Sequence, residues 1–159
     1  GEVKVEKKDC VVSFNYDAYL PEKYVKYPSQ RMALYKRIAL IQNEYDMDDI
    51  ADELLDRFGE LPYQVENLLR IALIRANAIN FGIKQITQMG NEVRMYPDGF
   101  DIDMWSIMSH IAGSRLRVVM GQMGETYVVF RLKSGENATA LINKLFEKYI
   151  ETVQKTEKK

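Results

Sequence analysis

Residues 46–62 read DMDDIADELLDRFGELP, and this stretch decides how the first half of the chain folds. At 100° per residue, its apolar and acidic side chains fall on opposite sides of a helix. The apolar arc holds Ile50, Ala51, Leu54, Leu55 and Phe58, and the acidic arc holds Asp49, Asp52, Glu53 and Asp56. The stretch therefore predicts a short amphipathic helix with one almost wholly acidic face.

Start and stop signals bound this predicted helix. Asp46 can cap the N-terminus, where carboxylates also suit the helix dipole. Gly59 stands where a helix commonly ends in a residue with positive φ, and Pro62 has the fixed φ that suits the first turn of a following helix. The stretch therefore predicts one helix that ends at Gly59 and another that begins at Pro62.

The charge of the chain is concentrated around this helix. Residues 42–66 contain nine acids and one base, Arg57, so their net charge is −8, whereas the whole chain carries −1. Like charges three or four residues apart on a helix repel one another, and only Arg57 is nearby in the sequence to offset them. The face is either simply solvated or a docking surface for a basic partner, and a near-neutral net charge gives no reason to expect general nucleic-acid binding.

Length and composition bound the class of protein. A chain of 159 residues with 47% apolar content can bury one core, or one core with a small second lobe. Cys10 is the single cysteine, which excludes an intramolecular disulfide, and no apolar run is long enough to span a membrane. We therefore expect a cytoplasmic protein that is monomeric as an isolated domain. Because the chain starts at Gly1 without a methionine, we expect a piece of a larger protein, with a linker or added start over 1–9.

The first half of the chain, residues 10–82, should be mainly helical. A β-branched and aromatic strand is predicted over 10–14, and a first helix over 29–41. The acidic helix follows, and a third helix over 62–81 is stopped by Gly82. Short loops join these three helices, so neighbours should pack antiparallel or at a steep angle.

The second half, residues 83–150, changes character. Two β-branched runs flank Gly90-Asn91 and predict a hairpin, which a helix over 101–111 follows. A second hairpin over 116–120 and 125–132 and a closing helix over 137–149 complete a ββαββα order. The prediction is an α+β fold: a three-helix segment, then two hairpin–helix units forming an antiparallel sheet with helices on one face. The polar, Lys-rich residues 151–159 should form a flexible tail.

No catalytic, metal or cofactor site emerges from the sequence. His110 is the only histidine, and its place near a predicted helix C-terminus favours a structural role. Cys10 lies in an apolar strand and reads as a core residue. Asp98, Asp101 and Asp103 lack the ladder and distal glutamate of a calcium loop, so a turn and an N-cap explain them better. The chain also lacks a phosphate-binding glycine loop, so we predict a non-enzymatic domain without cofactors.

The second hairpin offers another candidate surface. Leu116, Val118, Met120, Val128, Phe130 and Leu132 alternate inward, which leaves Arg115, Arg117, Arg131 and Lys133 on the other face with Tyr127. Cations with an aromatic ring on a sheet weakly resemble a platform for single-stranded nucleic acid. Charged residues on edge strands also discourage aggregation, and this second interpretation stays open.

Three linked blocks of sequence resemble a known family. They are DAYLPEKYV (17–25), QRMALYKRIALI (30–41) and ADELLDRFGELPYQVENLLRIALIRANAINFGI (51–83), of which ELLDRFGELP is the most specific. In this order they resemble the C-terminal domain of the bacterial transcription-repair coupling factor. From residue 84 onward the resemblance lies in the arrangement of elements more than in residues.

The resemblance implies a regulatory role in transcription-coupled nucleotide excision repair. The full factor is an ATP-dependent DNA translocase that displaces stalled RNA polymerase and recruits excision repair through an N-terminal module. Its C-terminal domain is thought to fold back on that module and mask the surface that binds the damage-recognition ATPase. Glu53 and Asp56 match family positions expected to clamp basic residues of the module, whereas Asp49 and Asp52 are placed by geometry alone.

The leading hypothesis is therefore an autoinhibitory interaction domain, whose partner is the intramolecular repair-recruiting module and, indirectly, the damage-recognition ATPase and RNA polymerase. The alternative is an accessory nucleic-acid-binding domain that uses Arg115, Arg117, Arg131 and Lys133.

Overall fold

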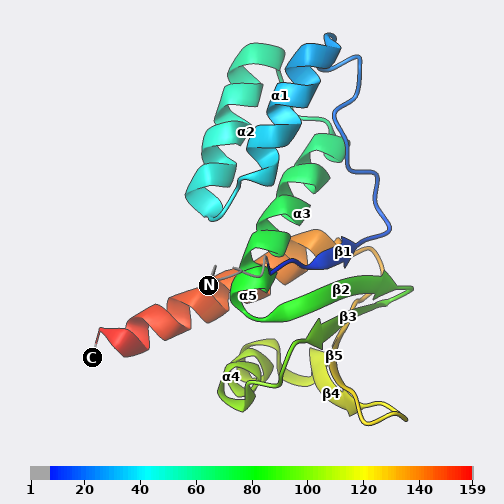
Figure 1. Cartoon of the computed structure of the whole chain (residues 1–159), viewed down its shortest axis with the longest axis vertical. Coiled ribbons are helices and arrows are strands. Elements are labelled where there is room, and N and C mark those ends of the chain that lie inside the picture. Colours follow the sequence, from blue (N-terminus) through cyan, green and yellow to red (C-terminus); the bar gives the residue numbers. More distant parts are fainter. Residues whose placement is uncertain (1–7, 159) are drawn as a thin grey trace, which may run out of the picture.

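One helix, α3 (Tyr63–Asn80), runs through both lobes of the molecule (Figure 1). With 18 residues it is about 27 Å long. Its first half packs in a helical lobe and its second half in a lobe built on a sheet. The structure, a computed structural model, describes residues 8–158. The predicted linker over 1–9 therefore lies mostly outside the described residues.

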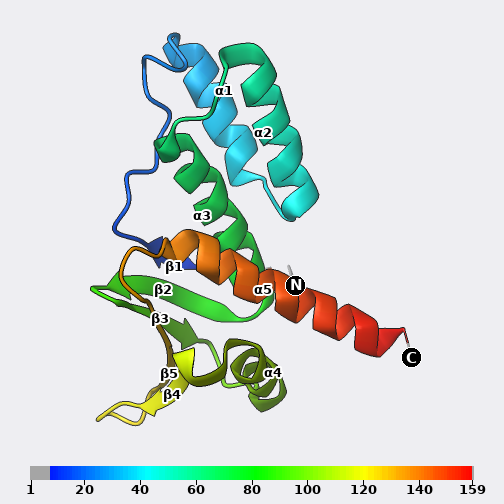
Figure 2. The ribbon, with the colours of Figure 1, turned by 180° about the vertical axis from the view of Figure 1, so that it is seen from behind.

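The helical lobe contains α1 (Pro28–Ala39), α2 (Glu44–Phe58) and the start of α3. The two short helices lie side by side and cover one end of α3, as both views show (Figure 1, Figure 2). Each contributes a narrow apolar stripe to one buried cluster, which the connector before α1 completes. Its buried members include Val25, Leu34, Ile38, Ile50, Leu54, Val65 and Leu69.

The sheet lobe contains the remaining elements. They are β1 (Val11–Ser13), β2 (Ile83–Met89), β3 (Glu92–Pro97), α4 (Ile102–Ala112), a 3₁₀ turn (Gly113–Arg115), β4 (Leu116–Met120), β5 (Thr126–Arg131) and α5 (Ala138–Glu157). The strands form one sheet in the order β1-β2-β3-β5-β4. Both predicted hairpins and the helix after each are confirmed.

The sheet is mixed because β1 pairs in parallel with β2, Val12 lying opposite Ile86. The other neighbouring strands are antiparallel. The antiparallel sheet predicted for the two hairpins is therefore confirmed, and β1, for which no pairing was predicted, adds a parallel edge strand. A parallel pair needs a crossover connection, and here the whole helical lobe supplies it. The sequence of a three-residue strand contains no pattern that predicts which other strand it pairs with.

Helices cover one face of the sheet, as predicted. Alternate residues of the central strands, including Val93, Met95, Val128 and Phe130, share one buried cluster with Trp105 of α4 and Phe146 of α5. The last turns of α3 join it through Ile74 and Ala78. Alternation along each strand gives the opposite face of the sheet a mixture of polar, aromatic and aliphatic side chains, among them Val129.

Two regions of the sheet lobe differ from the sequence prediction. The closing helix, expected to end near residue 149, continues to Glu157 through residues assigned to a flexible tail. Its C-terminal half projects from the body of the molecule (Figure 2). In the second hairpin, Val118 and Met120 were expected inward but are exposed, Met120 by 76%. The hairpin extends beyond the helices that cover Leu116. Side chains further along β4 still alternate between the two faces of the sheet, but no helix packs on them.

Helix ends elsewhere differ by a few residues. The first helix runs over Pro28–Ala39 rather than 29–41, with Pro28 in its first turn. Pro62 is the N-cap of α3 rather than a residue of its first turn, and its carbonyl accepts hydrogen bonds from Val65 and Glu66. Proline still suits this place, because the backbone N–H that it lacks has no partner at a helix start.

Candidate interaction surface on the acidic helix

The acidic helix α2 begins two residues before the predicted cap. Asn43 is the N-cap, and its side-chain oxygen accepts a hydrogen bond from the backbone N–H of Asp46 at 2.9 Å. The Asp46 carboxylate accepts in turn from the N–H of Gln42 at 3.0 Å. The prediction that Asp46 is the cap is therefore wrong. Asp46 instead forms the second half of a reciprocal arrangement similar to a capping box.

Helix α2 ends at its C-cap Gly59, as predicted. Gly59 has φ +90° and ψ −167°, a region open essentially only to glycine. The hydroxyl of Tyr24 lies 2.9 Å from the carbonyl oxygen of Gly59 and 3.1 Å from that of Leu54. Tyr24 thus ties the connector before α1 to the last turn of α2, and the sequence pattern alone gave no sign of this contact.

Two residues of the predicted apolar arc, Ile50 and Leu54, are buried. Leu55 was expected on the same arc but is 49% exposed. The buried stripe is narrower than the apolar arc because α2 packs on its neighbours along one side only. Leu55 thereby adds an apolar contact to the exposed surface of the helix.

Three of the four predicted partner-binding residues, Asp49, Asp52 and Asp56, are exposed on α2. Within residues 8–158, none of the three forms an ion pair. Their carboxylates are therefore available to a cationic partner, and their mutual repulsion has no internal compensation.

Glu53 differs from the other three acids because it is already engaged. Its Oε2 atom accepts from Arg37 of α1 at 2.6 Å and from Arg57 at 2.9 Å. The hydrogen bond from Arg37, followed by that from Arg57, lowers the pKa of the Glu53 carboxyl. Arg57 was therefore not the only cation nearby. Arg37 comes close because α1 lies beside α2, a relationship that a search along the acidic stretch cannot find.

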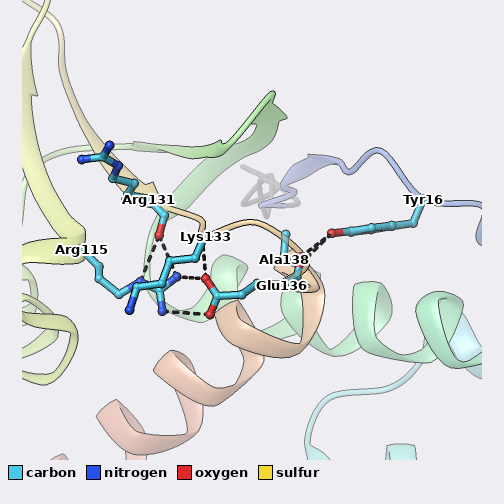
Figure 3. A network of polar contacts seen from close by, with 6 residues as sticks. All are labelled: Tyr16, Arg115, Arg131, Lys133, Glu136 and Ala138. Atoms are coloured by element: carbon cyan, nitrogen blue, oxygen red, sulfur yellow. Dashed lines mark hydrogen bonds and ion pairs between the residues drawn. The ribbon is translucent and has the colours of Figure 1, made fainter.

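On the second predicted surface, the last hairpin, Arg115 is engaged in internal contacts. Figure 3 shows the Arg115 guanidinium paired with the Glu136 carboxylate, and the Nε of Arg115 donates to the carbonyl of Arg131 at 3.0 Å. The hydrogen bond from Arg115, followed by that from the Lys133 N–H, lowers the pKa of Glu136. Arg115 therefore braces the start of α5 and is not free for a ligand.

The other cations of that surface are more open. Arg117 lies 3.2 Å from the Glu92 carboxylate but keeps 65% of its side chain exposed. Arg131 and Lys133 are exposed, and within the described residues neither side chain forms an ion pair. Tyr96 stacks on Tyr127 with ring centroids 5.4 Å apart, so this sheet face carries a second aromatic ring that the sequence prediction missed.

The structure shows the surroundings of the residues that were considered for catalysis or metal binding. Burial raises the pKa of the Cys10 thiol to about 11, so the reactive thiolate is scarce at neutral pH. His110 is exposed in the last turn of α4, and the Asp101 side chain caps that helix by accepting from the N–H of Met104. Over residues 8–158, no group of three or more histidine, cysteine or acidic side chains is arranged to hold a metal ion. No helix of the described chain has the length and apolar content to cross a bilayer.

Comparisons with known proteins match this chain to one family. The TRCF domain model matches residues 14–100, more than half of the chain. Transcription-repair-coupling factors of Staphylococcus epidermidis and Staphylococcus aureus are 32% and 33% identical to it over 94 and 95 residues. These matches cover 59% and 60% of this chain, which spans only about 8% of the length of either relative.

A solved structure shows the same fold. The crystal structure of a C-terminal domain of transcription-repair coupling factor has a TM-score of 0.78 and 21% sequence identity with this chain. The match covers 91% of this chain and 95% of that one, and thus includes the sheet lobe, where the sequence resemblance fades. The chain therefore belongs to the TRCF domain family, with the fold of the C-terminal domain of transcription-repair coupling factors.

Proposed function

We propose that this domain is a non-catalytic regulator of a transcription-repair coupling factor, an ATP-dependent translocase, and that it folds back onto the repair-recruiting module of that factor. The acidic face of α2, defined as Asp49, Asp52, Glu53 and Asp56, makes the contact. By covering the module, the domain masks the surface that recruits the damage-recognition ATPase of excision repair.

The observation that carries this proposal is the set of carboxylates without internal partners on one exposed helix face. Asp49, Asp52 and Asp56 form no ion pair within residues 8–158. Basic side chains of a partner would relieve their repulsion, and charge complementarity of this kind favours specific encounter. Contacts between domains of one chain are commonly modest and polar, and tethering raises the effective concentration, so weak pairs suffice for a closed state.

Glu53 has a particular part in this proposal. Both arginine contacts are made to its Oε2 atom, and within the described residues its Oε1 atom accepts no hydrogen bond. A cation of the module can therefore bind Oε1 while Arg37 and Arg57 hold the carboxylate in place. Preorganisation of this kind reduces the side-chain entropy lost on binding.

A titration of this chain against the purified repair-recruiting module tests the proposal. Glu53→Lys with Asp56→Lys should weaken binding by at least about tenfold, a loss of roughly 1.4 kcal/mol. The matched control makes the same charge change in the sheet lobe, with Asp98→Lys and Glu125→Lys, and should leave binding within about twofold. Equal loss in both double variants would point to net charge rather than to this face.

One observation favours the second candidate function, nucleic-acid binding by the outer sheet face. Tyr96 stacks on Tyr127, and the Arg94 guanidinium sits 5.6 Å from the centroid of the Tyr127 ring. Aromatic rings beside cations suit single-stranded nucleic acid. Retention on single-stranded DNA that falls steeply with salt would support this function, because phosphate contacts release counterions. Against it, Arg115 and Arg117 already have acidic partners.

A further inference from the structure

A groove lies between the first turn of α2, the middle of α3 and the middle of α5. Its volume is about 340 Å³. Its apolar lining comes from Tyr45 and Met47 of α2, Leu73 of α3 and Ile150 of α5. Tyr45 is 83% exposed, so its ring is open to apolar contact with a ligand. Three of its lining residues, Ile150, Glu151 and Gln154, lie in the C-terminal half of α5, which projects from the body of the molecule (Figure 1).

Two amide side chains of the groove have unmet hydrogen-bonding capacity. Asn143 donates through Nδ2 to the carbonyl of Arg70 at 3.1 Å, whereas its Oδ1 is buried without a partner in the described part of the chain. Asn77 is only 8% exposed, and no described residue bonds its side-chain amide. The Oδ1 of Asn143 is enclosed within the fold, whereas the amide of Asn77 keeps accessible surface and can bond to a polar group that enters the groove.

Acidic residues from two helices rim the groove. Glu44 of α2 and Glu147 and Glu151 of α5 line it, and Asp48 stands one turn after Glu44. Burial raises the pKa of Glu44, and the charges of Glu147, Asp48 and Glu151 raise it further. None of these four acids forms an ion pair within residues 8–158. The acids are therefore close enough to repel one another and lack cations of their own.

We propose that this groove binds a cationic amphipathic helix of a protein partner. Aliphatic side chains of that helix lie on Leu73 and Ile150, and its lysines or arginines pair with Glu44, Glu147 and Glu151. A polar side chain of the partner hydrogen-bonds to the amide of Asn77, which lines the groove. Helices commonly bind in grooves between other helices through apolar anchors at i, i+3, i+4 and i+7.

This site is distinct from the surface proposed above. It uses α5 and the start of α2, and none of Asp49, Asp52, Glu53 or Asp56 lines it. The two proposals can therefore fail separately. The acidic rim repels nucleic acid and anionic membrane surfaces, which leaves a basic protein segment as the matching ligand.

A designed peptide provides the test. The probe has about 18 residues, enough for five helical turns, with leucines at i, i+3, i+4 and i+7, lysines elsewhere and a fluorophore at one end. Its binding to the full 159-residue chain is followed by fluorescence anisotropy. A control peptide has the same composition with the leucines distributed around the helix. We expect the amphipathic peptide to bind at least about tenfold more tightly than the control.

Variants of α5 locate the binding. Glu147→Lys with Glu151→Lys should weaken binding of the amphipathic peptide by at least about tenfold, and Ile150→Ser should weaken this binding by about threefold or more. Asp98→Lys with Glu125→Lys carries the same charge change outside the groove and should stay within about twofold. If the double lysine variant fails to fold, as judged by circular dichroism, Glu147→Gln with Glu151→Gln takes its place.

Three results would overturn the proposal. One is equal binding of both peptides, which would mean attraction by charge alone. Another is an unchanged affinity in the Glu147 and Glu151 variants. The third is the absence of measurable binding by the amphipathic peptide. Backbone hydrogen exchange gives an independent readout, since the bound peptide should protect amides around Tyr45 and Ile150 and leave those of β4 unchanged.

Discussion

The carboxylate of Glu53 joins two helices: its Oε2 atom lies 2.6 Å from the Arg37 guanidinium on α1 and 2.9 Å from that of Arg57 one turn further along α2. The side chains are partly exposed, so this network contributes little free energy by itself. Its main effect is to fix one carboxylate in the middle of an otherwise unpaired acidic face.

The Arg37–Glu53 pair should weaken at low pH. Since the folded-state pKa of Glu53 is lowered, its stabilisation is fully present above the unfolded value of about 4.3 and disappears as pH falls through the folded-state value. A double-mutant cycle of Arg37→Ala and Glu53→Gln, measured by urea unfolding, should give a coupling energy of about 0.5–1 kcal/mol at neutral pH. A coupling of equal size well below the folded-state pKa would contradict this assignment.

Gly59→Ala should destabilise the domain through its backbone alone. A Cβ built at Gly59 meets no atom within 4 Å, so crowding contributes nothing, whereas φ +90° strains any residue with a side chain. We expect a loss of about 1–3 kcal/mol in the free energy of unfolding. Glu60→Ala, at the exposed neighbouring residue, is the control and should change it by less than about 0.5 kcal/mol.

The neighbours Leu54 and Leu55 provide a matched test of how α2 is oriented. Leu54 is fully buried and Leu55 is 49% exposed, so the same change should have unequal costs. Leu54→Ala should lower the free energy of unfolding by about 2–5 kcal/mol, and Leu55→Ala by less than about 1 kcal/mol. Similar costs at both positions would mean that α2 is rotated from the described orientation.

Reversal of the acidic face should activate the proposed full-length coupling factor. Glu53→Lys with Asp56→Lys should leave folding intact, because partly or fully exposed charges contribute about 0–1 kcal/mol each, and should strengthen binding of the damage-recognition ATPase. Deletion of the whole domain is the reference for complete opening. If deletion raises that affinity and the double reversal does not, masking uses another surface. If neither raises it, autoinhibition by this domain is wrong.

Sequence reasoning located the elements that local signals specify. Gly59 and Gly90 have positive φ, which few residues other than glycine adopt, and the acidic helix has an apolar stripe of helical period. The parallel pairing of Val12 with Ile86 was missed because it joins residues more than 70 positions apart, and a short strand offers no pattern that selects a partner.

The acidic surface was predicted only in part, because helical periodicity gives the exposure of its residues but not their contacts with other helices. Exposure of Asp49, Asp52 and Asp56 follows from helical periodicity alone. The contact between Arg37 and Glu53 depends on how two helices pack, which periodicity does not contain. The groove on α5 was missed because residues 151–157 look like a polar tail, although Ile150 and Val153 continue the apolar spacing into it.

The continuity of α3 has a mechanical consequence. Because this helix contributes Val65 and Leu69 to one buried cluster and Ile74 and Ala78 to the other, no flexible joint separates the lobes. A force applied to the acidic face is therefore transmitted along α3 to the sheet lobe. Bending α3 would require breaking consecutive backbone hydrogen bonds between its two packed ends. A partner that binds α2 therefore moves both lobes together.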